Sequence, residues 1–198
     1  MIIKLSPLRS DARLSVHKHG DTLTLNGVSL DFSRLEEGAT LPASAIGNEW
    51  LGADVERIDG HLLLTLRLPH GSDADERSRF PVDIVDPQDG VVALPGGTDQ
   101  PVSGSVPGGI DWAQVVSAAM KAAAASAQRI AALTADIAAR RARADAAIAP
   151  LQDASELDEA TSAELDALKA WKRYRIALNR VVEQPGYPDS VDWPAAPA

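Results

Sequence analysis

The four histidines are the first residues whose type suggests metal chemistry. His17 and His19 are two positions apart, which places both on one face if that stretch is a strand, and a third ligand would complete a zinc site. No third ligand lies near them in the sequence, and His61 and His70 lie beside turn residues. We therefore predict no metal site and interpret the histidines as solvated or hydrogen-bonded.

Other motifs lack part of the pattern that their chemistry needs. Asp73, Asp75 and Glu76 resemble the start of a calcium loop, but the turn glycine and the distal glutamate are missing. The Pro-Gly-Gly triplets at 95–97 and 107–109 are not followed by the Gly-Lys-Ser/Thr of a phosphate loop. No nucleophile elbow, zinc-protease motif or convincing carboxylate pair is present. The sequence predicts no catalytic residues and no cofactor, so an enzyme is unsupported.

Aromatic side chains gather at the C-terminal end, where the last thirty residues hold four of the eight in the chain. Tryptophan and tyrosine anchor many protein interfaces, and arginine adds forked donors for partner carboxylates. The predicted partner-binding residues are Trp171, Tyr174, Arg175, Tyr187, Trp193 and Pro194, with Arg173 and Arg180 as further donors. The alternative is that Trp171 packs under its own tail and Trp193 folds back onto the helix as a local core.

Charge argues against a nucleic-acid partner. Residues 169–175 are basic with interleaved aromatics, which is typical of a single-strand binding patch. Acidic residues flank them, however, and the whole chain has 19 basic and 28 acidic residues, a net charge of −9. Binding through phosphates needs a basic surface. We predict no nucleic-acid partner.

Length and composition limit the architecture. The chain has 198 residues, enough for one or two small domains, and its low aromatic content of 4% means a core of mainly Ala, Leu, Val and Ile. The absence of cysteine excludes disulfides and thiolate sites and is compatible with a reducing cytoplasm. No long uncharged apolar run and no signal-peptide pattern occur, so no membrane association is predicted.

Residues 1–94 are predicted to form a small antiparallel β domain. Two alternating segments each contain a hairpin dipeptide, Asn26-Gly27 in the first and Asp59-Gly60 in the second, which favour a tight turn between strands. The second hairpin is expected to be central in the sheet. Pro42 indicates a short helix or turn, and residues 80–85 and 90–94 are predicted to add edge strands.

The remainder is predicted to be a flexible linker followed by helices. Residues 95–110 are rich in Pro, Gly and Ser and are interpreted as the linker. A capping pair, Asp111 and Gln114, is predicted to start a long Ala-rich helix over 111–150 that Pro150 ends or kinks. Its apolar residues recur at heptad spacing, which favours pairing with a second copy or another chain. The expected fold class is α+β.

The C-terminal region, 151–198, carries a second capping box and a distinctive set of residues. Thr161 and Glu164 are predicted to open a helix that ends before Pro185, and an extended tail follows. The helix bears Trp-Lys-Arg-Tyr-Arg at 171–175, and the tail ends in Trp193-Pro194 close to the chain end. In order, spacing and terminal position, residues 140–195 closely resemble the C-terminal region of caudoviral tail fibre assembly proteins.

The resemblance implies a role in the assembly of phage or prophage tails. It implies a small accessory protein that acts as a chaperone in the host bacterial cytoplasm, binds the trimeric tail fibre or its receptor-binding tip, and assists its folding or trimerisation. The alternative is a stoichiometric structural component of the tail, fibre or baseplate, retained in the virion. The long Ala-rich helix and the acidic β domain depart from the family pattern.

Overall fold

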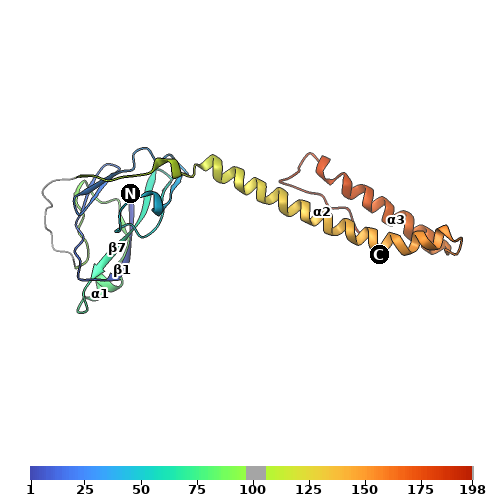
Figure 1. The fold of residues 1–198 in the computed structure, drawn as a ribbon, viewed down its shortest axis with the longest axis horizontal. Coiled ribbons are helices and arrows are strands. Elements are labelled where there is room, and N and C mark those ends of the chain that lie inside the picture. Colours follow the sequence, from blue (N-terminus) through green and yellow to red (C-terminus); the bar gives the residue numbers. More distant parts are fainter. Residues whose placement is uncertain (97–105, 198) are drawn as a thin grey trace. The chain divides into compact units, whose positions relative to one another are not determined.

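The computed structural model describes residues 1–96 and 106–197, and its fold class is α+β. The chain divides into two compact units, Met1–Lys121 and Ala122–Ala198. The first unit contains all strands of the described residues, and the second contains most of the long helix α2 (Ala118–Glu156) together with helix α3 (Ser162–Asn179). Figure 1 shows both units and the described helices. This confirms the predicted fold class.

The described residues of the N-terminal unit form two five-stranded sheets. The strands of the first sheet, in spatial order, are β5 (Thr40–Leu41), β6 (Val55–Ile58), β7 (His61–His70), β1 (Ile2–Arg9) and β8 (Ile84–Val85). Those of the second are β10 (Val106–Pro107), β4 (Val28–Asp31), β3 (Thr22–Leu25), β2 (Val16–His19) and β9 (Gly90–Val91). Short helices lie at Ala43–Ala45 (η1), Glu76–Arg79 (α1) and Trp112–Gln114 (η2).

Both predicted hairpins are present. Asn26 and Gly27 join β3 to β4, and Asp59 and Gly60 join β6 to β7, with positive φ angles at all four residues. Two consecutive positive φ angles are what a two-residue hairpin turn of this twist requires. Strand β7 is the central strand of its sheet, and β8 and β9 are edge strands, as the sequence predicts.

The sheets are mainly antiparallel, as the sequence predicts, but each also contains one parallel pair that no local sequence pattern indicates. Strand β1 pairs in parallel with β7 along its whole length, from Ile2 beside Leu63 to Arg9 beside His70. Strand β10 also pairs in parallel, with β4. Parallel partners are necessarily far apart in the sequence, so no turn signal marks them, and Pro7 obscures the strand pattern of β1.

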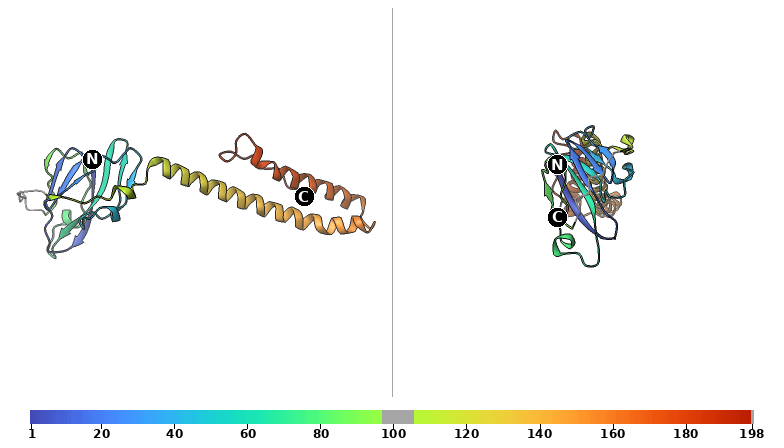
Figure 2. Two further views of the ribbon diagram at one scale, coloured as in Figure 1. Left: turned by 45° about the horizontal axis from the view of Figure 1, so that its top comes forward. Right: turned by 90° about the vertical axis from the view of Figure 1, so that its left-hand side faces the viewer.

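One hydrophobic core joins the two sheets. Alternate residues of β7 are buried, as are Ile3 and Leu5 of β1 and Leu23 and Leu25 of β3, because side chains alternate between the faces of a strand. All of these belong to a single cluster of buried aliphatic residues with one aromatic, Phe32. Figure 2 shows the sheets from two further directions. The core therefore has the aliphatic composition that the sequence predicts.

Part of the predicted linker is paired with the N-terminal unit. Residues 97–105 lie outside the described residues. The part after them adds β10 to the second sheet, and the backbone amide of Asp111 donates to the carbonyl of Ala45 at 2.8 Å. The prediction of a flexible linker is thus wrong for Val106–Ile110, because the backbone of this segment forms hydrogen bonds with β4 and with the η1 region. The division of the chain into the four regions 1–94, 95–110, 111–150 and 151–198 stays a prediction.

Helix α2 begins at Ala118, seven residues after the predicted cap. Asp111 and Gln114 do bond to each other, but they cap the short helix η2. The side chains of Trp112 and Val115 pack against the N-terminal core, so they do not belong to the apolar face of a separate helix. The hydroxyl of Ser117 accepts the amide of Met120 and starts α2 instead.

Helix α2 also continues past Pro150 to Glu156, which corrects the predicted end. A proline inside a helix costs about 3 kcal/mol because it removes one hydrogen bond and crowds the preceding turn. Ile148 is buried and Leu151 packs against the core of the C-terminal unit, and burying such a side chain contributes about 1.5–3 kcal/mol. Packing on both sides of Pro150 therefore offsets its cost.

The first turn of α2 is fixed to the N-terminal unit by backbone and side-chain contacts. Thr40 and Val116 exchange two backbone hydrogen bonds of 2.9 Å. Lys121 lies 3.4 Å from the carboxylate of Glu56. The hydrogen bond from the Thr40 hydroxyl and the charge of Lys121 lower the pKa of Glu56. A Cβ added at Gly38 would lie 2.9 Å from the Cβ of Ala118.

The close approach of Gly38 to Ala118 predicts a difference in stability between two glycine variants. Gly38 and Gly20 both have positive φ angles, but nothing lies within 4 Å of a Cβ at Gly20. Gly20→Ala should cost about 1 kcal/mol through backbone strain alone. Gly38→Ala should cost about 1–2 kcal/mol more, because the helix start must shift. Urea unfolding of both variants measures the difference, and equal losses would contradict the fixed helix start.

Candidate partner-binding site

The C-terminal unit is a helical hairpin built around two aromatic side chains. Helix α3 turns Leu168, Trp171, Tyr174 and Leu178 toward α2, because residues three and four apart share one face of a helix. On α2, the facing buried residues are Ala144 and Ile148. The rings of Trp171 and Tyr174 meet edge to face, with centroids 5.8 Å apart. This arrangement is favourable for aromatic quadrupoles.

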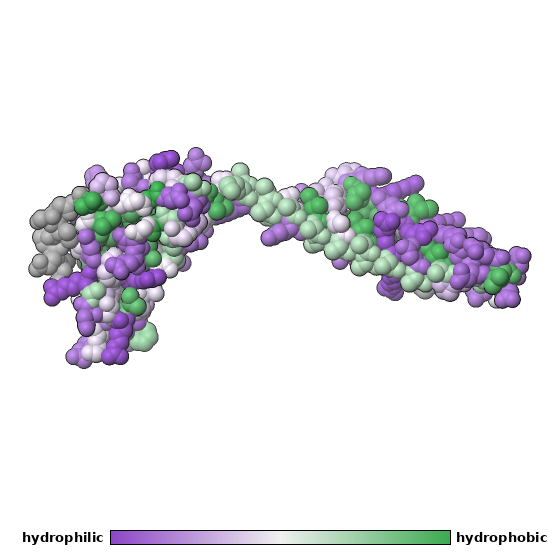
Figure 3. Space-filling view, in the orientation of Figure 1, coloured by the Kyte–Doolittle hydropathy of each residue, from purple (hydrophilic) through white to green (hydrophobic). Residues whose placement is uncertain are grey.

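The α2 residues at the predicted heptad spacing form the face of the helix that packs in this hairpin. Leu133, Ile137, Ala147 and Leu151 are half-buried, in the same phase as the buried residues, whereas the first turns of the helix are exposed. In Figure 3 the exposed first half of α2 is pale green, the colour of alanine. This face therefore meets segments of the same chain over its second half. Pairing with a second copy stays a prediction.

A capping box starts α3, as the sequence predicts. The side chain of Thr161 accepts the amide of Glu164 at 3.3 Å, and the Glu164 carboxylate accepts the amide and the hydroxyl of Thr161, both at 2.7 Å. These donors stabilise the charged carboxylate and lower the pKa of Glu164. The connection before the cap contains Asp158 at a positive φ of 57°.

The C-terminal tail folds back onto the hairpin. The side-chain amide of Gln184 makes two hydrogen bonds to the backbone of Asp192, of 2.7 and 2.9 Å. Asp189 forms an ion pair of 2.9 Å with Arg129 on α2. The guanidinium of Arg140 lies over the ring of Trp193, 4.2 Å from its centroid. Figure 1 shows the tail turning back after α3 toward the end marked C.

The predicted binding residues fall into two groups. Trp171 and Tyr174 are only 8% and 5% exposed. Trp193 packs against the same core, which is the arrangement that the local-core alternative expects of Trp171 and Trp193. Tyr187, Pro194 and Arg175 are half-buried, and Arg175 pairs with Asp145 at 2.8 Å. Their contact with a partner stays a prediction.

The sequence analysis missed the residues that hold the tail. Arg129 and Arg140 are 60 and 53 residues from their partners Asp189 and Trp193, so no local motif joins them. Gln184 pairs with Asp192 across a turn that holds two prolines, Pro185 and Pro188. A glutamine nine residues before Trp193 is the one signal that the sequence offers.

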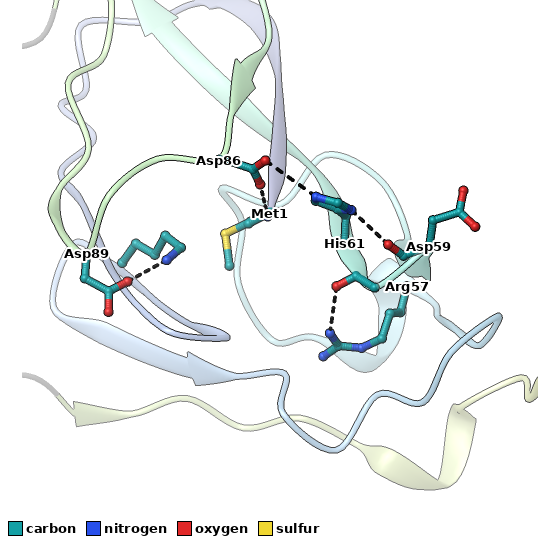
Figure 4. A network of polar contacts seen from close by, with 8 residues as sticks. Met1, Arg57, Asp59, His61, Asp86 and Asp89 are labelled. Carbon is teal, nitrogen blue, oxygen red and sulfur yellow. Dashed lines mark hydrogen bonds and ion pairs between the residues drawn. The ribbon is translucent and has the colours of Figure 1, made fainter.

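Two histidines of the N-terminal unit, His19 and His61, each lie next to a single carboxylate. Figure 4 shows His61 and the amino group of Met1 pointing toward Asp86, at 3.5 and 2.8 Å. The bond from the amino group lowers the pKa of Asp86. His19 lies 3.6 Å from Asp89. Within residues 1–96 and 106–197, no group of three or more His, Cys, Asp or Glu side chains could hold a metal ion.

The acidic segment after β7 caps a helix. Asp75 accepts the amide and the hydroxyl of Ser78, at 2.9 and 2.6 Å, and so starts α1. These bonds lower the pKa of Asp75. In the part of the chain that the structure describes, no helix combines the length and the apolar character needed to cross a membrane.

The capping box of α3 predicts that the stability of the folded protein depends on pH. Because the pKa of Glu164 is lowered in the folded state, its contribution is present above the unfolded-state pKa and is lost as pH falls through the folded-state pKa. Glu164→Gln should therefore reduce stability near pH ~7 but make little difference near pH ~3. Unfolding curves at both values measure this. Exposed Glu183 is a suitable control, and equal pH dependence of Glu164→Gln and Glu183→Gln would contradict the prediction.

Removal of either tail contact, that of Trp193 or that of Gln184, should reduce the protection of the tail amides from hydrogen exchange. Trp193→Ala should cost about 2–3 kcal/mol through lost burial and the lost contact with Arg140. Gln184→Ala should cost about 1–2 kcal/mol, since it removes two hydrogen bonds. In both variants, amide hydrogen exchange should accelerate over residues 184–197 and not in the sheets. Unchanged exchange in this segment would show that the tail is not held by these contacts.

Comparison with known proteins identifies relatives of this C-terminal part. The sequence model of the family described as "Caudovirales tail fibre assembly protein, lambda gpK" matches residues 91–198. The tail fiber assembly protein of Escherichia phage lambda is 54% identical over 50 residues, 25% of each chain. The prophage tail fiber assembly protein homolog TfaR of Escherichia coli (strain K12) is 50% identical over 50 residues, again 25% of each chain.

A third relative, a probable tail fiber assembly protein of Acyrthosiphon pisum secondary endosymbiont phage 1, is 52% identical over 50 residues, which is 25% of this chain and 31% of the relative. The chain thus matches only a quarter to a third of the length of these relatives. No solved structure matches. Because the family model spans more than half of the chain and covers the whole helical hairpin with its tail, the chain belongs to the tail fibre assembly protein family of tailed phages and prophages.

Proposed function

We propose that the protein is a chaperone that binds a phage or prophage tail fibre and assists its folding or trimerisation. The observation that carries the proposal is the family match over residues 91–198, which includes the whole C-terminal unit. That unit has its own core and its own contact cluster. A self-contained unit that relatives share is a suitable module for recognising a partner.

The chaperone acts by covering fibre surface before the trimer has formed. Unpaired strand edges and exposed apolar side chains on a slowly folding β-rich protein lead to aggregation. A bound unit shields such surface until association with the other fibre subunits buries it. This requires no catalysis, and it takes place in the cytoplasm of the host bacterium. Of the predicted residues, half-buried Arg175, Tyr187, Trp193 and Pro194 offer surface, while Trp171 and Tyr174 shape the unit from inside.

A second candidate is a structural component that stays in the tail, fibre or baseplate. The exposed first half of α2 favours it, because an Ala-rich helix of this length offers a long surface for close packing. The two functions differ in the fate of the protein. A chaperone leaves the assembled particle, whereas a structural component remains in a fixed ratio to the fibre.

Co-expression with the tail fibre encoded beside this chain tests the proposal. The yield of soluble trimeric fibre should rise severalfold with the full chain, measured by size-exclusion chromatography with light scattering. Purified particles should lack the protein. Retention in a fixed ratio would instead support the structural component. If fibre yield is unaffected and the two proteins do not associate, both functions are wrong.

A further inference from the structure

Basic residues concentrate at one level of the C-terminal hairpin. Residues 140–148 of α2 and residues 172–180, which are the end of α3 and its C-cap Arg180, contain seven basic residues and one acidic residue, Asp145. The chain as a whole has a net charge of −9. Such a concentration of positive charge in an acidic protein favours contact with a negatively charged surface.

The two basic stretches lie next to each other in the folded hairpin. Arg175 of α3 pairs with Asp145 of α2 at 2.8 Å. Ala144 and Ile148 of α2 share one buried cluster with Tyr174 and Leu178 of α3. The two basic stretches therefore lie at the same level of the hairpin.

Most of these charges have no carboxylate partner among the described residues of the unit. Arg175 pairs with Asp145, and Arg140 lies over Trp193. The other five form no ion pair with any described residue: Arg141, Arg143, Lys172, Arg173 and Arg180. Unpaired guanidinium groups on the surface are available for bidentate bonds with partner carboxylates.

Helix α3 also places an apolar side chain among these charges. Lys169, Arg173, Ile176 and Arg180 follow one another at spacings of four, three and four, so they form one outward row, opposite the buried face. Ile176 is 51% exposed, between the two arginines. Lys169 has only a local ion pair with Asp166, and both side chains are largely exposed. Arginine around an apolar contact is typical of strongly contributing interface residues.

The buried aromatics decide between two classes of partner. Single-stranded nucleic acid needs exposed rings on which bases stack. Trp171 and Tyr174 lie next to the basic residues in the sequence, but both rings are buried in the hairpin core. The outward row therefore offers charge and one aliphatic side chain without a stacking platform. This composition fits an acidic protein surface better than nucleic acid.

We propose that the outward row of α3 binds a carboxylate-rich surface of the tail fibre, with Ile176 in an apolar contact and Arg173 and Arg180 paired with acidic side chains. This inference rests on the proposed function and names the surface that performs it. It assigns recognition to residues that lie next to Trp171 and Tyr174 in the sequence, while these two aromatic side chains belong to the core.

The test is a double charge reversal in the full chain. Arg173→Glu with Arg180→Glu should weaken binding to the purified tail fibre at least about tenfold. Wild-type binding should also weaken as sodium chloride rises from about 0.05 to about 0.5 M. Ile176→Ala should weaken binding severalfold with no change in salt dependence. Surface plasmon resonance with immobilised fibre measures all of these.

A matched control separates a local effect from the change in net charge. Arg77 and Arg79 on α1 are exposed and lie in the other unit, so Arg77→Glu with Arg79→Glu changes net charge equally and should leave binding unchanged. Circular dichroism should show equal helix content in all variants, because Arg173 and Arg180 are exposed.

The outcomes are distinguishable from a failure of the proposed function. If the wild-type chain does not bind the fibre, the proposed function is wrong. If wild type binds and the Arg173/Arg180 reversal binds equally well, only this inference is overturned. Binding of a fluorescent single-stranded oligonucleotide that the reversal abolishes, or self-association that it abolishes, would also overturn the inference and assign the row to nucleic acid or to a second copy.

Discussion

The fold of the C-terminal unit depends on the burial of Trp171 between α2, α3 and the returning tail. Helix α2 is rich in alanine, and alanine buries little apolar area, so two alanine-faced helices would associate weakly. The large rings of Trp171 and Tyr174, with Trp193 from the tail, supply the missing area. The tail contacts of Gln184 and Arg140 keep Trp193 in place in this core.

The same burial determines which side chains remain for recognition. Aromatic residues in a terminal segment suggest an exposed binding patch, yet here three of the four, Trp171, Tyr174 and Trp193, form a core. The surface that this core supports is mainly basic on α3, with Ile176 as an isolated apolar side chain. Rigid helices hold those charges at fixed spacing, which favours specific contact over general attraction. The N-terminal unit has a core of its own and holds the first turn of α2 through Thr40 and Val116.

Sequence patterns predict the local features of this fold well and the distant ones poorly. Both hairpin turns, the short helix after Pro42 and the Thr161 capping box depend on neighbouring residues, and all are present. The pairing of β1 with β7, the strand at Val106–Pro107 and the passage of α2 through Pro150 depend on tertiary contacts, and local propensity misplaces them. For the candidate site, the pattern of aromatics marks the right segment but not which rings are buried.

Hydrogen exchange of the full chain, alone and bound to the tail fibre, tests the central claim that the C-terminal unit recognises the fibre. In the free chain, the account predicts slow exchange around Trp171 and over the tail held by Gln184. On binding, new protection should concentrate in residues 162–197, with little change in the strands of the N-terminal unit. Protection confined to residues 1–96, with none in the helical hairpin, would contradict the account.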